Sequence, residues 1–207
     1  MTRQKNDIVD RKAIVHKNIV ALLKNRIFLI LAFCIFIYIG VETVAATFID
    51  SYFELALAAP ELSAMTLSLF WGAMIPSRFL AGIVKLSGKN IMVFSLIIVL
   101  ASVLGGMLAP WHMAKLAMFA LCGFGCGPVW PLLMNEATKI NSGASGLETN
   151  SMVVFGAAGG ILYPLFSGAL ASAFSLATAY YLCAASAIIA LVLFLKYHLT
   201  ASRIRGF

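Results

Sequence analysis

The chain has 207 residues, of which 62% are hydrophobic and only 11% are charged, and its formal net charge is +7. A water-soluble domain of this size has too little interior to hide so much apolar surface, so the composition indicates an integral membrane protein. The basic residues lie at the two ends and in short loops, which indicates membrane topology and contact with anionic lipid rather than nucleic-acid binding.

Residues 1–26 form a polar, basic arm. The arm has neither the apolar core nor the small-residue cleavage site of a signal peptide. We therefore expect a short amphipathic segment on the cytoplasmic surface.

Six apolar segments follow, and each is long enough to cross a bilayer. An even number of spans places both termini on one side, and nearly all of the 15 Lys and Arg residues fall on that side, which the positive-inside rule makes cytoplasmic. The sequence thus predicts a multi-pass protein of the cytoplasmic (inner) membrane with a basic tail at 197–207. We expect the spans near 27–50, 62–84, 90–109, 112–134, 149–172 and 175–196.

A polar connector at 135–148 divides the spans into two groups of three. An odd number in each group means that the second group runs inverted relative to the first. The second span reads FWGAMIPSRFLAG and the fifth reads FGAAGGILYPLFSG, and both combine an aromatic residue, glycines and an internal proline. The third and sixth spans carry few polar groups, so we expect them to face lipid while the other four line a cavity.

The first span carries Glu42, with Tyr38 and Thr43 on the same helix face. A charged residue near the bilayer centre costs roughly 2.5–3.5 kcal/mol on insertion scales, so such a residue usually has a use. We interpret Glu42 as a group that couples transport to protons or binds a polar solute. The alternative is a protonated carboxyl that bonds a neighbouring helix.

The second span carries Trp71 and Arg78. Arg78 lies on the order of 12 Å nearer the cytoplasm than Glu42, so the sequence does not favour a direct ion pair. We expect Arg78 to cap helix carbonyls or to form part of a cytoplasmic gate. Trp71 is either a stacking surface for a ligand ring or a packing residue.

The fourth span reads ALCGFGCGPVWPLLMNEAT. Pro128 and Pro131 remove backbone donors and should bend the helix, which ends in Trp130 and Asn135 and suits a moving cytoplasmic half. Cys122 and Cys126 share a helix face, but no further ligand completes a metal site, so all four cysteines are interpreted as packing residues.

The sequence contains no arrangement of nucleophile and base, no phosphate-binding loop and no haem-type histidine pair. We expect neither an enzyme nor a cofactor.

Three stretches carry a family resemblance: ALLKNRIFLILAFCIFIYIGVE, SLFWGAMIPSRFLAG and NSMVVFGAAGGILYPLFSGALASAFSLATAYYL. Together they resemble the carboxy-terminal half of a major facilitator superfamily transporter, and the second is similar to the fucose/glucose–proton symporter branch. The resemblance implies an all-α bundle of two inverted three-helix repeats. It also implies that Glu42 and Tyr38 face the cavity and that Arg78 belongs to the cytoplasmic gate region.

The interpretation is a half-sized secondary transporter for a small polar, sugar-like solute, coupled to protons and assembled as a parallel homodimer or with a separate partner half. One alternative is a transport-inactive scaffold or a fragment of a longer transporter. Another is efflux of lipophilic cations.

Overall fold

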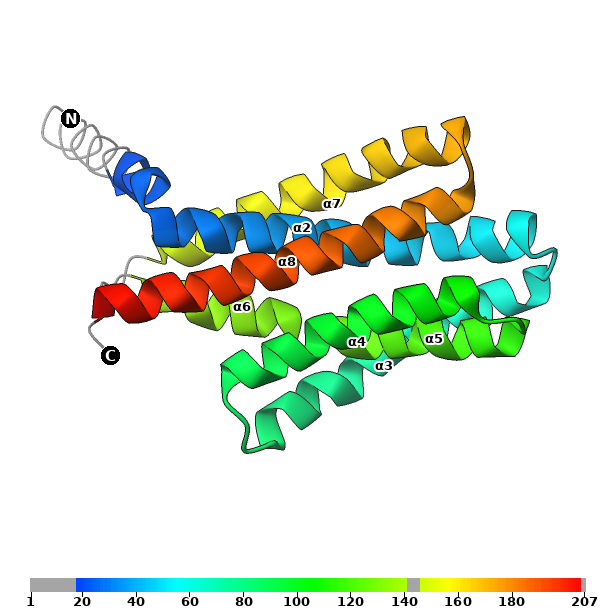
Figure 1. Ribbon diagram of the computed structural model, residues 1–207, viewed down its shortest axis with the longest axis horizontal. Coiled ribbons are helices and arrows are strands. Elements are labelled where there is room, and N and C mark those ends of the chain that lie inside the picture. Colours follow the sequence, from blue (N-terminus) through cyan, green and yellow to red (C-terminus); the bar gives the residue numbers. More distant parts are fainter. Residues whose placement is uncertain (1–17, 141–145, 206–207) are drawn as a thin grey trace, which may run out of the picture.

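A computed structural model describes residues 18–140 and 146–205, and these are helical almost throughout (Figure 1). Most of the basic arm, and with it most of the expected amphipathic segment, lies outside the described residues, although residues 18–24 are helical. The expected all-α membrane fold is confirmed. The elements are α2 (Arg26–Ser51), a π-helical turn η1 (Tyr52–Ala56), a 3-10 turn η2 (Pro60–Leu62), α3 (Ser63–Ile83), α4 (Gly88–Leu108), α5 (His112–Cys126), α6 (Val129–Thr138), α7 (Leu147–Ala173) and α8 (Leu176–Arg205).

Within the described residues, five helical segments are long and apolar enough to cross a membrane. They are Arg26–Ala56, Gly88–Leu108, His112–Thr138, Leu147–Ala173 and Leu176–Ser202. The expected second span corresponds to α3, which has 21 residues but is less apolar because it contains Pro76, Arg78 and several hydroxyl side chains. That α3 crosses the membrane therefore stays a prediction.

The helix ends differ from the expected spans in three places. The first span continues as a π-helical turn to Ala56, and the fourth is broken into α5 and α6. The last helix runs to Arg205, so most of the expected tail is a continuation of α8. The polar connector is shorter than expected, because α6 extends to Thr138 and α7 starts at Leu147.

Helix packing divides the bundle into two equivalent groups, one of α2, α7 and α8 and the other of α5, α3 and α4. The helix α2 packs mainly against α7 and α8, while α5 packs mainly against α3 and α4, and α4 joins α8 between the groups (Figure 1). Exchanging α2 with α5, α3 with α7 and α4 with α8 leaves this set of pairings unchanged. The packing therefore has the pattern expected of two inverted three-helix repeats.

The arrangement leaves one side of the central helices open. The helices α4 and α8 cover α2 and α5 on one side, and α7 and α3 flank them (Figure 1). The remaining side of α2 and α5 has no further helix of the described chain over it. The two helices expected to face lipid, α4 and α8, lie together on the covered side of α2 and α5, and that they face lipid stays a prediction.

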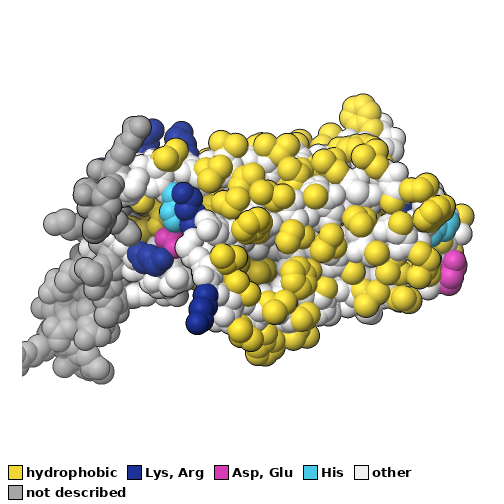
Figure 2. Space-filling model, turned by 60° about the horizontal axis from the view of Figure 1, so that its bottom comes forward, with side chains coloured by type: hydrophobic (Ala, Val, Ile, Leu, Met, Phe, Trp, Pro, Cys, Tyr) yellow, Lys and Arg dark blue, Asp and Glu magenta, His cyan; other side chains and the backbone are white. Residues whose placement is uncertain are grey.

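Hydrophobic and basic side chains are distributed unevenly along the long axis of the molecule. Figure 2 shows hydrophobic side chains over most of the visible face, with most of the visible Lys and Arg side chains near one end. The described chain begins and ends at that same end (Figure 1). An apolar belt with a basic end is the distribution that a bilayer and the positive-inside rule select.

Two glycines permit close contact between helices. A Cβ added at Gly123 of α5 would overlap the backbone carbonyl of Phe70 in α3, and one added at Gly159 of α7 would overlap that of Phe36 in α2. These contacts lie at the α5–α3 and α2–α7 pairs, which exchange with each other in the repeat. Small residues at such points let two backbones approach closely, which strengthens van der Waals packing between helices in lipid.

We predict that Gly123→Ala lowers stability by about 1–3 kcal/mol, because the new methyl group must push α3 away from α5. Gly72→Ala is the matched control: nothing lies within 4 Å of its added Cβ, so it should be neutral or gain up to about 1 kcal/mol from helix propensity. The four buried cysteines make thermal unfolding measurable with a thiol-reactive fluorophore. Equal melting temperatures for the two variants would contradict the close contact.

Candidate functional site

The central feature of the site is the break between α5 and α6. The first helix ends at Cys126, and the second begins at Val129 after Gly127 and Pro128. In an unbroken helix the carbonyl of Gly127 would accept a hydrogen bond from residue 131, but Pro131 has no N–H. The break leaves backbone carbonyls that need other donors, as expected for buried polar groups.

Side chains from two other helices bind adjacent carbonyls at this break. The Tyr38 hydroxyl of α2 lies 2.8 Å from the carbonyl oxygen of Cys126. The Nε of Arg78 in α3 donates to the carbonyl of Gly127 at 3.0 Å. The break therefore receives one polar side chain from α2, which packs with α7 and α8, and one from α3, which packs with α5. The bond from Arg78 is of the carbonyl-capping kind expected from the sequence, whereas its role in gating stays a prediction.

Glu42 joins this arrangement through Tyr38. The two residues are one helical turn apart on α2, and the Tyr38 hydroxyl hydrogen-bonds the Glu42 carboxyl. Tyr38 is buried and Glu42 is half-buried. Within the described residues, Glu42 and Arg78 form no direct ion pair. They are connected instead through neighbouring atoms of the broken backbone.

Hydrogen counting limits what the Tyr38 hydroxyl can do. A phenol carries one hydrogen, so Tyr38 donates either to the Glu42 carboxylate or to the Cys126 carbonyl, but not to both. If Glu42 is protonated, its own hydrogen goes to the Tyr38 oxygen, and Tyr38 donates to Cys126. Both short contacts are then satisfied at once.

Two further residues named from the sequence lie away from this network. Thr43 faces α7, where an added Cβ at Gly160 would lie 3.5 Å from its hydroxyl oxygen. Trp71 is 46% exposed and packs edge-on against Phe70, with ring centroids 5.3 Å apart. The structure does not bring either side chain together with Glu42, and their roles in binding a ligand stay predictions.

The residues named for gating lie on both sides of the break. Pro128 is buried within it, and Pro131 is exposed in the first turn of α6. Trp130 packs against α7, since an added Cβ at Gly156 would lie 3.1 Å from its ring, and Asn135 is exposed. The expected interruption of the fourth span by prolines is present, whereas movement of its second half stays a prediction.

Sequence reasoning missed a buried lysine at the other end of the bundle. Lys115 of α5 is 7% exposed, and its Nζ lies 3.0 and 3.2 Å from the carbonyls of Gly106 and Met107 in the last turn of α4. The ammonium also lies 5.8 Å from the centroid of the Tyr52 ring. A cation at a helix C-terminus pairs orphan carbonyls and complements the helix dipole. The expected fourth span, 112–134, includes Lys115 near its external end, and the apolar flanks in HMAKLAMF were an available signal for its burial.

A second missed cluster ties α6 to α8. Glu136 is buried and accepts from Lys139 at 2.6 Å and from the Tyr197 hydroxyl at 2.9 Å. The sequence placed Glu136 in a polar connector, whereas it lies in the last turns of α6. Nothing in the spacing of these residues relates position 136 to position 197, because that contact depends on tertiary packing.

All four cysteines are buried and free, as packing residues would be. Among the described residues, no group of His, Cys, Asp and Glu is arranged to hold a metal ion.

These features define a multi-pass helical membrane protein with inverted repeats and a broken central helix. A family model for the Major Facilitator Superfamily matches residues 31–205. The chain therefore belongs to the major facilitator superfamily, whose members are transporters that move small solutes across membranes. A search of curated proteins found no match, and the fucose/glucose branch stays a prediction.

We predict that Lys115→Met destabilises the protein by about 1–3 kcal/mol, because the last carbonyls of α4 lose their buried donor. Lys24→Met is the control, since Lys24 is exposed just before the start of α2 and its replacement should change stability little. Thermal unfolding of both variants in the same detergent measures the difference. An unchanged melting temperature for Lys115→Met would show that the lysine is not an important cap.

Proposed function

We propose that this protein moves a small polar solute across the membrane by alternating access and couples the movement to protons through Glu42. The observation that carries the proposal is the hydrogen-bonded connection from Glu42 through Tyr38 to the Cys126 carbonyl. This connection joins a carboxyl group, through one tyrosine hydroxyl, to the break of a central helix. A carboxyl group in a span is a common element of proton relays in transporters.

The proton would act by switching the Tyr38 hydrogen bond. With Glu42 protonated, Tyr38 donates to Cys126 and holds α2 against the break. With Glu42 ionised, the Tyr38 hydrogen goes to the carboxylate, and the Cys126 carbonyl loses its donor. The loss of a buried hydrogen bond costs about 1–3 kcal/mol, which is enough to shift the balance between two arrangements of the helices.

Arg78 would stabilise the second side of the break. It holds the Gly127 carbonyl from α3, and it is partly exposed, so its guanidinium remains accessible from the open face. In the proposed cycle, Tyr38 exchanges its partner while Arg78 keeps α3 attached to α5. The prolines lower the free-energy cost of this rearrangement, because the backbone hydrogen bonds of the helix are already interrupted at this point.

The open side of α2 and α5 requires a second helical unit. A half-buried carboxyl facing lipid is costly, so the polar face would be covered by another six-helix unit, either a second copy of this chain or a separate partner half. Two such units related by an axis along the membrane normal would enclose the cavity. The basic residues at one end predict that this end is cytoplasmic in both units.

The test uses proteoliposomes with an imposed inward proton gradient and radiolabelled fucose and glucose as first solutes. Wild type should accumulate solute against its gradient. Glu42→Gln should lose accumulation yet retain downhill exchange, because the amide cannot release a proton. Tyr38→Phe should weaken accumulation by removing the link to Cys126.

Glu54→Gln is the matched control, because Glu54 is exposed on the π-helical turn and should leave transport unchanged. Accumulation by Glu42→Gln equal to that of wild type would contradict proton coupling through this residue. If tetraphenylphosphonium is transported instead of the sugars, the protein is an exporter of lipophilic cations.

A further inference from the structure

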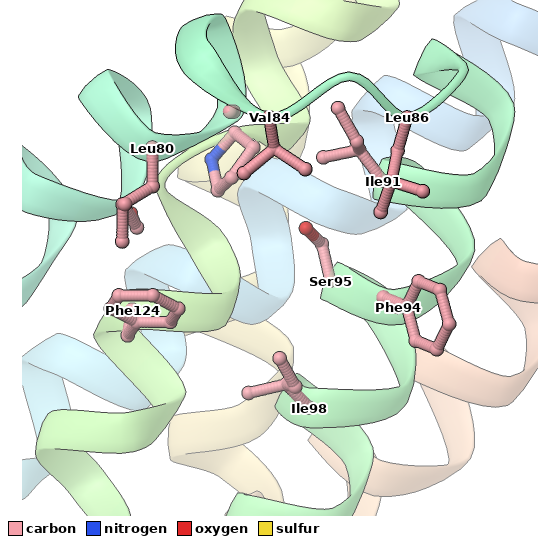
Figure 3. A pocket seen from close by; sticks show the side chains of 11 residues that line it. Leu80, Val84, Leu86, Ile91, Phe94, Ser95, Ile98 and Phe124 are labelled. Atoms are coloured by element: carbon pink, nitrogen blue, oxygen red, sulfur yellow. The ribbon is translucent and has the colours of Figure 1, made fainter.

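An apolar cavity of about 260 Å³ lies apart from the Glu42 site (Figure 3). It is partly open and is lined by the end of α3, the connection after it and the first turns of α4, with α5 behind. Six apolar side chains make up most of its wall: Leu80, Val84, Leu86, Ile91, Phe94 and Ile98. No charged side chain lines it, so the cavity suits hydrocarbon rather than a polar solute.

The cavity lies at the depth of lipid chains. Ile98 lies ten residues after the start of α4 at Gly88, so the wall extends about 15 Å along that helix. The α4 helix is one of the five apolar enough to cross a membrane. An apolar cavity along a membrane-spanning helix is of the right chemistry to accept a lipid acyl chain.

The rim of the cavity is basic. Lys85 lies between two lining residues, Val84 and Leu86, and Lys89 lies two positions before Ile91. Both lysines are exposed, and neither forms an ion pair with an acidic residue in the part of the chain that the structure describes. The amino-terminal end of α4 lies at the same rim and adds the positive end of its dipole.

We propose that this cavity is a binding site for an anionic phospholipid, with an acyl chain inside it and the phosphate group held by Lys85 and Lys89. Basic pockets between transmembrane helices on the cytoplasmic side bind anionic headgroups, and each lysine near the surface contributes about 1 kcal/mol. A zwitterionic lipid with the same chains fills the cavity equally well but gains less from the two lysines.

The bound chain would also contact the broken helix. Pro128 and Ser77 belong to the wall, and an added Cβ at Gly127 would overlap the Ser77 hydroxyl. The lipid would therefore contact the break from α3 and α4, whereas Tyr38 reaches the break from α2. This inference does not depend on the proposed solute or on proton coupling, because it rests on the cavity and its rim alone.

The test is native mass spectrometry of the delipidated full chain, titrated with phosphatidylglycerol or with phosphatidylcholine of the same acyl chains. We expect one phosphatidylglycerol to bind in preference to phosphatidylcholine. The double variant Lys85→Gln/Lys89→Gln should bind phosphatidylglycerol roughly ten- to thirtyfold more weakly. Ala81→Phe, which places a ring in the cavity wall, should weaken both lipids.

Lys24→Gln/Lys196→Gln is the matched control: it removes the same charge from the predicted cytoplasmic side but not from the rim, so it should bind lipid like wild type. Equal binding of the two lipids by wild type would overturn the proposal, as would equal loss in the control variant. Unchanged binding in Ala81→Phe would show that the chain does not enter the cavity. Melting temperatures of all variants establish that each is folded.

Discussion

A backbone carbonyl that loses its helix partner inside a bilayer has no water to replace it, and this constraint shapes the centre of the protein. Pro131 removes the donor that the Gly127 carbonyl would use, and the helix stops at Cys126. The fold supplies side-chain donors instead, from Tyr38 on α2 and from Arg78 on α3. The polar residues of three helices therefore meet at one defect in the backbone.

Close packing of the helices keeps these donors in reach. The backbone of α3 contacts α5 at Gly123, and the backbone of α7 contacts α2 at Gly159. The α3–α5 pair and the α2–α7 pair are equivalent in the inverted repeat. A glycine therefore permits the same kind of close contact in both halves of the bundle. The result is a set of closely packed helix pairs around the interrupted helix.

The sequence predicted the features that depend on local composition. The lengths of the apolar segments predicted the helices, and Pro128 and Pro131 predicted the interruption of the fourth span. Both effects act within a few residues of the chain. The four-residue spacing of Tyr38 and Glu42 placed them on one helix face. Sorting the spans by polarity also grouped α4 with α8, and these two helices lie together on one side of α2 and α5.

Features that depend on partners far along the chain were beyond sequence reasoning. Glu136 meets Tyr197 across more than sixty positions, so no local pattern distinguishes Glu136 from a surface charge. The apolar flanks of Lys115 indicate burial, but they do not identify the carbonyls of α4 as its partners. The orientation of Thr43 toward α7 also follows from helix packing. The same applies to the link from Tyr38 to Cys126, since one periodic face of α2 is compatible with several neighbours.

The account depends on Glu42 exchanging its proton next to the helix break. Infrared difference spectroscopy of the reconstituted protein, wild type minus Glu42→Gln, tests this directly because the protonated carboxyl has its own C=O stretching band. We expect such a band at low pH, its loss as the pH rises, and a shift of the band in Tyr38→Phe. The absence of any protonated-carboxyl band assignable to Glu42 across the pH range in which the protein is folded would contradict it.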